Sequence, residues 1–352
     1  MMKNAEAVLA QKRASGEMES YAFLVSIDGK EFLLTSPDVD RDTYFDVASA
    51  GKILVTTQLV LKAIDEDRLA LTDTLDKFFS HVPDEKKSIT LQQLLTHTSG
   101  IVRTPIPAEI CARNNDVIAA HILSAGLAFA PGTDFVYSCA GMMLVGFILE
   151  KLYAMTLDEL FFVKIKHPLG IDRMRFNIAV DEENAAVCYQ REEAGLRRMD
   201  DWTVVLLRNG VSGAGGSFWS IHAVDTLVKA IMAKDKRLYS SAIFDLAEQI
   251  YTPELEEKRG LGYQFDNMKG AVDLGRLFSK GSFGHCGWTG ASVFMNRAKT
   301  MYAIALSNTR RCMVRKYPDS YGIDKSGNDM VYMQLRDVFD AIKTDLDENG
   351  LI

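Results

Sequence analysis

The chain has 352 residues, of which 47% are apolar and 25% are charged, a balance typical of a folded globular protein and not of a disordered or fibrous one. Its 40 Lys and Arg residues against 47 Asp and Glu residues give a net charge of −7. A mildly acidic chain lacks the positive field that attracts phosphate backbones, so the composition argues against nucleic acid as a partner. The length exceeds the usual ~100–200 residues of one domain and predicts two lobes or one large composite domain.

Two further absences in the sequence bear on location. No run reaches the ~18–20 apolar residues that cross a bilayer, and residues 1–13 are too polar for a secretory signal. The five cysteines are odd in number, scattered and without CxxC spacing, which favours reduced thiols over disulfides and predicts no metal site. We therefore expect a cytoplasmic protein with no membrane span.

The pattern of apolar residues predicts these elements in chain order. A short helix over 1–15 precedes two strands, 21–27 and 31–34, that flank Asp28-Gly29, a strong hairpin signal. A helical pattern runs from Ser49 to Ile64, and a mainly helical middle follows, with its most apolar helix at 142–153. A helix at 222–233, a second hairpin (291–295 and 301–306) and a closing helix at 330–344 complete the chain.

Strands at both ends with helices between them predict an α+β fold. We expect one antiparallel sheet, built from both termini and flanked by helices, with a mainly helical lobe inserted. The sheet lobe would comprise 1–60 and 205–352, and the helical lobe 61–204. The active site would lie in the cleft between them.

The tetrapeptide Ser49-Ala50-Gly51-Lys52 is the first candidate for chemistry. Residues three apart on a helix are neighbours, so the Lys52 amine can reach the Ser49 hydroxyl. The positive end of a helix favours an alkoxide at Ser49 and a neutral amine at Lys52. The pattern indicates a nucleophile with its base, although a serine before a helix is also the ordinary N-cap residue.

Two stretches after Ser49 carry a family resemblance: 69–73, which reads LALTD, and 89–100, which reads ITLQQLLTHTSG. They resemble stretches of the serine β-lactamase and penicillin-binding protein superfamily, most closely its class C-like branch of esterases and D-aminopeptidases. We interpret His97, in the second stretch, as a buried and hydrogen-bonded residue and not as a catalytic one. Residues 212–220 and 259–263 resemble two other stretches of the family, and we interpret them as scaffold or cleft rim.

The segment 131–139 (PGTDFVYSC) resembles the family's P-G-x-x-x-x-Y-S-N motif. The resemblance implies that Tyr137 exchanges a proton with the nucleophile and the leaving group; the alternative is a tyrosine that fills a lobe interface. Adjacent cations are expected to lower the pKa of this phenol from its ordinary ~10. Cys139 replaces the family's asparagine, a substrate-binding residue, and a thiol is only a weak donor and acceptor.

The segment Gly284-His285-Cys286-Gly287-Trp288 resembles the family's K-[ST]-G strand in its H-x-G variant. The resemblance implies that His285 is catalytic, that Cys286 and Gly287 contact substrate, and that the backbone N–H groups of Ser49 and Trp288 form an oxyanion hole. Gly287 would let substrate approach the backbone. Because an ordinary imidazole titrates near ~6.5, activity should then change with pH near neutrality.

The resemblance implies a serine hydrolase that works through an acyl-enzyme on Ser49 without a cofactor. Cys139 and His285 favour an esterase, or an amidase or peptidase on small ester, D-amino-acid or peptide substrates. A β-lactamase or DD-peptidase acting on β-lactams or peptides is the alternative. A protein of another class, a sensor or scaffold that does not turn substrate over, also stays open, as does the oligomeric state.

Overall fold

The computed structural model describes residues 1–102, 104–111, 113–176, 178–179, 184–186, 196–197, 210–265, 275–278, 281–316 and 330–352. Its N-terminal part follows the predicted pattern closely: α1 (Lys3–Ala14) precedes a hairpin of β1 (Tyr21–Ile27) and β2 (Lys30–Thr35). Asp28 and Gly29 between the strands both have positive φ, 48° and 77°, as the tight hairpin turn requires.

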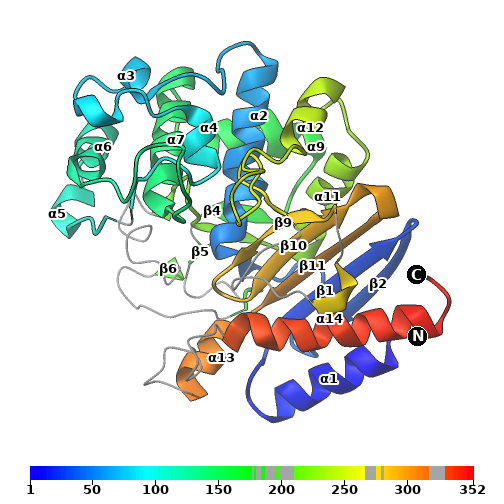
Figure 1. The fold of residues 1–352 in the computed structure, drawn as a ribbon. Helices are drawn as coiled ribbons and strands as arrows, with labels where there is room; N and C mark the ends of the chain where they lie inside the picture. Colours follow the sequence, from blue (N-terminus) through cyan, green and yellow to red (C-terminus); the bar gives the residue numbers. More distant parts are fainter. Residues whose placement is uncertain are drawn as a thin grey trace.

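The main sheet has six antiparallel strands in the order β2-β1-β11-β10-β9-β8 (Figure 1). The four C-terminal strands are β8 (Gln264–Phe265), β9 (Phe283–Gly287), β10 (Ala291–Asn296) and β11 (Met301–Ser307). β1 pairs with β11 along its whole length, from Tyr21 opposite Ser307 to Ile27 opposite Met301. The first and last parts of the chain thus form one sheet, and the predicted α+β class is confirmed.

Helices cover both faces of this sheet. In Figure 1, α1 and α14 (Met330–Glu348) lie side by side along one face, and α2 (Thr57–Asp65) and α11 (Ile221–Met232) lie on the other side. Successive side chains of a strand point to opposite faces. Accordingly Phe23 and Val25 belong to the core under α1 and α14, whereas Leu24 belongs to the larger core on the opposite face.

The middle of the chain is mainly helical, as predicted. Its most buried helix is α7 (Cys139–Tyr153), in which every residue from 140 to 150 is buried. The other helices of the described residues are α3 (Leu75–Phe78), α4 (Leu91–Leu95), α5 (Ala108–Cys111), α6 (Asn115–Ser124), α8 (Leu157–Phe161), α9 (His167–Leu169), α12 (Ser241–Ala247) and α13 (Thr309–Lys316). The predicted lobe boundary at 204/205 lies outside the described residues.

One small sheet joins the middle of the chain to the segment before Ser49, and a second lies within the middle of the chain. β3 (Phe45–Asp46) and β4 (Met174–Phe176) both pair with β7 (Ser217–Trp219), and β5 (Ile178–Ala179) pairs with β6 (Leu196–Arg197). Within the described parts of the chain no single helix is long and apolar enough to cross a membrane; α7 and the helical stretch 157–169 pass the test only as a pair, bent by 73°.

Candidate active site

Ser49 lies on a short 3-10 turn, Ala48–Ala50, and not at the start of a regular α-helix. A π-helical turn, Lys52–Thr56, follows and leads into α2. Ala48 has a φ of +45°, a left-handed conformation that is strained for a residue with a side chain. Its backbone N–H donates to Oδ1 of Asp46 at 2.8 Å, which helps to hold the turn. Both features, backbone strain and a π-turn, are typical of functional sites.

The predicted contact between Ser49 and Lys52 forms. Lys52 is fully buried, and its Nζ donates to Oγ of Ser49 at 2.9 Å and to the carbonyl oxygen of Ala214 at 2.7 Å. A longer contact of 3.5 Å joins the same Nζ to Sγ of Cys139. The amine is therefore fixed in direction by three neighbours, one of which is the candidate nucleophile.

The glycine-rich loop around Gly213 supplies the backbone that fixes Lys52. A Cβ on Gly213 would lie 2.3 Å from the carbonyl oxygen of Met142 in α7, so only glycine lets the loop pack this closely. The carbonyl oxygen of Gly213 also accepts a hydrogen bond of 2.7 Å from Oγ1 of Thr56. Of the two predicted roles of this loop, scaffold or cleft rim, the contacts with Lys52 and Thr56 are those of a scaffold.

Tyr137 lies beside Lys52, with Nζ 5.2 Å from the centre of its ring. Its ring is partly exposed, but its Oη is buried and has no hydrogen-bond partner among the described residues. Burial raises the pKa of Tyr137 above its ordinary value, and the nearby Lys52 ammonium only partly opposes this. The expectation that cations would lower this pKa is therefore wrong, because desolvation outweighs the charge of Lys52.

His285 reaches the same place from β9. Its ring centre lies 6.0 Å from that of Tyr137, and its Nδ1–H donates to the carbonyl oxygen of Cys286 at 2.6 Å. Burial, reinforced by the positive charges of Lys52 and Arg259, holds the pKa of His285 well below 6.5. The expected change of charge near neutral pH is therefore wrong: the imidazole is neutral there, with Nε2 as its unprotonated nitrogen.

The structure contradicts the expected role of Cys286 and gives Gly287 a packing role. Because neighbours on a strand face opposite ways, Cys286 points into the core under α1 and α14, where it is 2% exposed and its Sγ lies 3.3 Å from Oγ of Ser292. Gly287 faces the protein itself: a Cβ there would lie 2.1 Å from the carbonyl oxygen of Val47. Gly287 therefore lets the segment before Ser49 pack on β9. The side chain of Cys286 is not placed to contact a substrate as predicted, whereas a contact between substrate and the backbone of Gly287 stays a prediction.

The turn after β9 brings Trp288 close to the Ser49 segment. β8 pairs only with residues 283 and 284, so residues 285–287 continue beyond that short neighbour. Oγ1 of Thr289 donates to the carbonyl oxygen of Asp46 at 2.7 Å, which ties the turn to the strand before Ser49. Trp288 is partly exposed, and the guanidinium of Arg310 lies 3.7 Å from its ring centre.

His97 is buried, as predicted, and supports Tyr137. Its ring centre lies 4.6 Å from that of Tyr137, and its Nδ1 accepts a hydrogen bond of 3.3 Å from the backbone N–H of Ser138. Burial, with a contribution from the charge of Arg259, holds the pKa of His97 well below 6.5. A neutral imidazole thus packs on the candidate catalytic tyrosine and holds the backbone next to it.

Two charged residues near the site, Arg310 beside Trp288 and Arg259, were not among the predicted functional residues. Arg259 begins a stretch that we interpreted as scaffold or cleft rim. It is 3% exposed, and its guanidinium lies 4.6 Å from the ring centre of Phe135. Residues 259–263 resemble the family's y-G-L-G-W stretch, and the available signal was that Arg259 stands where this stretch has an aromatic residue. Among the described residues no group of three His, Cys, Asp or Glu side chains could hold a metal ion.

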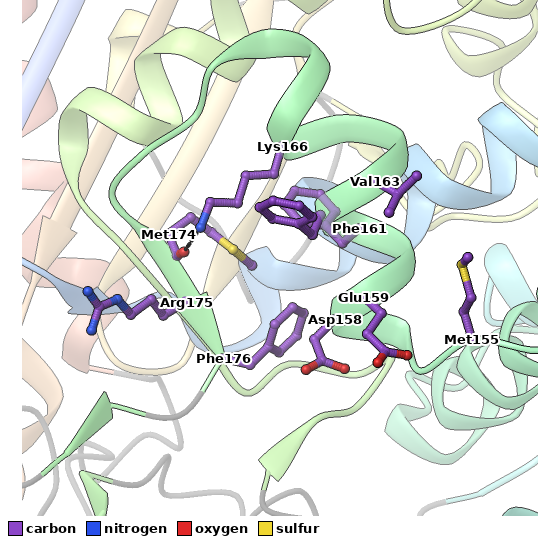
Figure 2. Close-up of a pocket in the computed structure, with 10 residues that line it drawn as sticks. Met155, Asp158, Glu159, Phe161, Val163, Lys166, Met174, Arg175 and Phe176 are labelled. Carbon is purple, nitrogen blue, oxygen red and sulfur yellow. Dashed lines mark hydrogen bonds between the residues drawn. The ribbon is translucent and has the colours of Figure 1, made fainter.

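A separate pocket of about 590 Å³ lies between α8 and β4 and is shown in Figure 2. Its lining includes Phe161, Phe162, Val163 and Phe176, with Asp158 and Lys166 among its polar residues. None of its lining residues belongs to the group around Ser49. It therefore has no part in the chemistry described above.

A family model described as Beta-lactamase matches residues 5–323, and the chain therefore belongs to the Beta-lactamase family. This match confirms the predicted class, a β-lactamase-like serine hydrolase.

Individual relatives are distant. A Salmonella typhimurium protein with the provisional name D-alanyl-D-alanine carboxypeptidase is 23% identical over 324 residues, which cover 82% of this chain and 75% of the relative. The structure of EstCE1, a hydrolase with promiscuous acyltransferase activity, matches with a TM-score of 0.72 at 18% identity and covers 97% of each chain. The octameric penicillin-binding protein homologue from Pyrococcus abyssi matches with a TM-score of 0.69 at 21% identity over 98% of this chain and 77% of that one. At such identities the structural likeness shows a common fold.

Proposed function

We propose that this protein hydrolyses small esters or amides, including D-amino-acid or peptide substrates, through an acyl-enzyme formed on Ser49. The observation that carries the proposal is the 2.9 Å hydrogen bond from Nζ of the buried Lys52 to Oγ of Ser49, beside the ring of Tyr137. The similar structure described as a hydrolase with promiscuous acyltransferase activity and the relative named as a carboxypeptidase support this range of substrates.

The proposed reaction proceeds through the minor fraction of Tyr137 that is in the phenolate form, because burial holds the pKa of this phenol above its ordinary value. Its oxygen takes the Ser49 proton while the Ser49 oxygen attacks the carbonyl carbon, and the Lys52 ammonium stabilises the serine oxygen through its hydrogen bond. The negative charge then lies on the carbonyl oxygen, where the backbone N–H groups of Ser49 and Trp288 would receive it. When the bond to the leaving group breaks, Tyr137 returns the proton to that group. Water then releases the acid by the same steps in reverse.

His285 acts in this scheme as a neutral group that packs near Tyr137. Cys139, partly exposed and 3.5 Å from Lys52 Nζ, would line the acyl side of the site. Because a thiol is a poor partner for an amide, this residue favours esters over acylamide substrates such as penicillins. We place the site between a sheet lobe, which supplies Ser49, His285 and Trp288, and a helical lobe, which supplies Tyr137.

The test uses a chromogenic short-chain ester and a fluorescent penicillin, with turnover and covalent labelling followed together. Turnover of the ester that falls about 10³-fold or more in Ser49→Ala supports the proposal. Ser124→Ala, an exposed serine at the end of α6, is the matched control and should keep full turnover. Rapid turnover of penicillin would favour the β-lactamase alternative, and permanent labelling without turnover would favour a sensor. Ester turnover that survives in Ser49→Ala would refute the assignment of the nucleophile.

A further inference from the structure

Arg259 carries a buried positive charge that is only partly neutralised. Its Nη2 lies 3.5 Å from Oε2 of Glu257, a distance too long for a strong hydrogen bond. Nε and Nη1 are buried, and neither has a hydrogen-bond partner among the described residues. Burial also raises the pKa of Glu257, which weakens the counter-charge. Burying a guanidinium without full neutralisation lowers the free energy of unfolding. This cost points to a functional role for the charge.

The position of Arg259 links it to Tyr137 by two routes. Its guanidinium packs on Phe135, two residues before Tyr137, and Phe135 contacts His97, which contacts Tyr137 in turn at 4.6 Å between ring centres. On the other side, Arg259 forms a backbone bridge with Gln264, which pairs with the residue before His285. Burial lowers the pKa of Arg259 below its ordinary value, and the charge of Glu257 and, after it, a negative charge on Tyr137 oppose this shift. The contacts through Phe135 and His97 place the guanidinium near enough to Tyr137 for the two charges to interact.

A phenolate at Tyr137 would be stabilised by a second positive charge besides that of Lys52. Both imidazoles beside Tyr137, those of His97 and His285, are neutral, and the Lys52 ammonium already donates to Ser49 and to a backbone carbonyl. We propose that Arg259 is a positioning residue that acts through Tyr137: its buried guanidinium supplies a second positive charge that stabilises the tyrosinate formed during proton transfer. This inference rests on the proposed function, in which Tyr137 exchanges the proton.

The experiment compares Arg259→Gln, Arg259→Lys and Glu257→Gln with the wild type. The first readout is the pH dependence of kcat/KM for an uncharged chromogenic ester. Because loss of the guanidinium makes the tyrosinate less favourable, the acid limb of Arg259→Gln should move to higher pH by about one pH unit, with kcat/KM about tenfold lower near neutrality and recovering in alkali. Arg259→Lys should keep the wild-type limb. Glu257→Gln removes the counter-charge and should move the limb to lower pH.

A second readout does not depend on turnover. Difference ultraviolet titration of each folded variant against the same variant carrying Tyr137→Phe follows the ionisation of Tyr137 directly. It should show Tyr137 ionising at higher pH in Arg259→Gln and at lower pH in Glu257→Gln. Cys139, His97, His285 and Lys52, the other titratable groups around the phenol, are common to all variants. Circular dichroism and urea unfolding identify variants that fail to fold.

Three results would overturn the inference: an unshifted Tyr137 titration in Arg259→Gln, a uniform loss of kcat/KM at every pH, or a shift of the same sign in Arg259→Gln and Glu257→Gln. A uniform loss of kcat/KM, or shifts of the same sign, would show that Arg259 only holds the backbone of its own segment in place. Failure of the proposed function would show itself differently, because turnover would then be absent or independent of Ser49 while the titration of Tyr137 still reports on Arg259.

Discussion

Gly287 packs closely on the backbone of Val47 and so positions the segment that carries Ser49. Because Gly287 contacts no reacting group, a substitution there tests this positioning alone. In Gly287→Ala the new Cβ would lie 2.1 Å from the Val47 carbonyl oxygen, 1.3 Å less than the 3.4 Å at which ordinary contact begins. The obstructing atoms belong to the backbone, so no change of rotamer relieves the overlap. β9 and the segment that carries Ser49 must separate by about 1 Å, and we expect a loss of about 1–3 kcal/mol in the free energy of unfolding.

The catalytic effect should exceed the loss of stability. A displacement of about 1 Å at reacting groups lowers rates on the order of 100-fold, so kcat/KM for a short-chain ester should fall by about that factor while the protein remains folded at room temperature. Gly126→Ala is the matched control, since a Cβ there meets nothing within 4 Å. It should be neutral or stabilising by up to about 1 kcal/mol. A Gly287→Ala protein with wild-type stability and with kcat/KM within a few-fold of wild type would refute the idea that β9 positions Ser49.

Two further predictions concern the cysteines and the buried histidines. Iodoacetamide should alkylate the partly exposed Cys139 before the buried Cys286, as located by mass spectrometry, and should abolish ester turnover. The Cys139→Ala variant should keep its ester turnover under the same treatment. Full turnover after complete labelling of Cys139 would contradict this placement. His97 and His285 have folded-state pKa values well below 6.5, so the unfolded state binds more protons once the pH falls below ~6.5 and stability must decrease there. Between about pH 7.5 and about pH 5.5 we expect the free energy of unfolding, measured in urea, to fall by about 1.4 kcal/mol per histidine. This decrease should be smaller in His97→Asn and the same as in the wild type in a variant of the exposed His222. Equal stability at both pH values would show that the imidazoles are not buried as neutral groups.

Local signals in the sequence were strong wherever a segment's structure depends on its own residues. The Asp28-Gly29 turn predicted the first hairpin, and β1 has the predicted bounds, Tyr21–Ile27. The second hairpin and the closing helix were also predicted. The 3-10 and π-turns around Ser49 were not, because they depend on packing against β9 and the glycine loop, which the local apolar pattern does not encode.

The same distinction separates the predicted site residues that the fold brings together from the one that it turns away. Spacing and the family motifs led to Ser49, Lys52, Tyr137 and His285, which the fold does bring together. Alternation along β9 could have excluded Cys286, since a strand that turns His285 towards Tyr137 must turn the next residue away. The packing of Gly287 on Val47 could not have been predicted from alternation along the strand, because the two residues lie far apart in the sequence.

The sequence by itself determined which chemical groups are available and in what order: a serine with a lysine three residues later, a tyrosine before an apolar helix and a histidine on a late strand. Tertiary structure alone decided their ionisation and the identity of the second cation. A pKa depends on how much water and charge surround a group, and here those surroundings come from segments that are distant along the chain. Burial makes His285 neutral and Tyr137 a weaker acid, and the fold brings the guanidinium of Arg259 within electrostatic range of both.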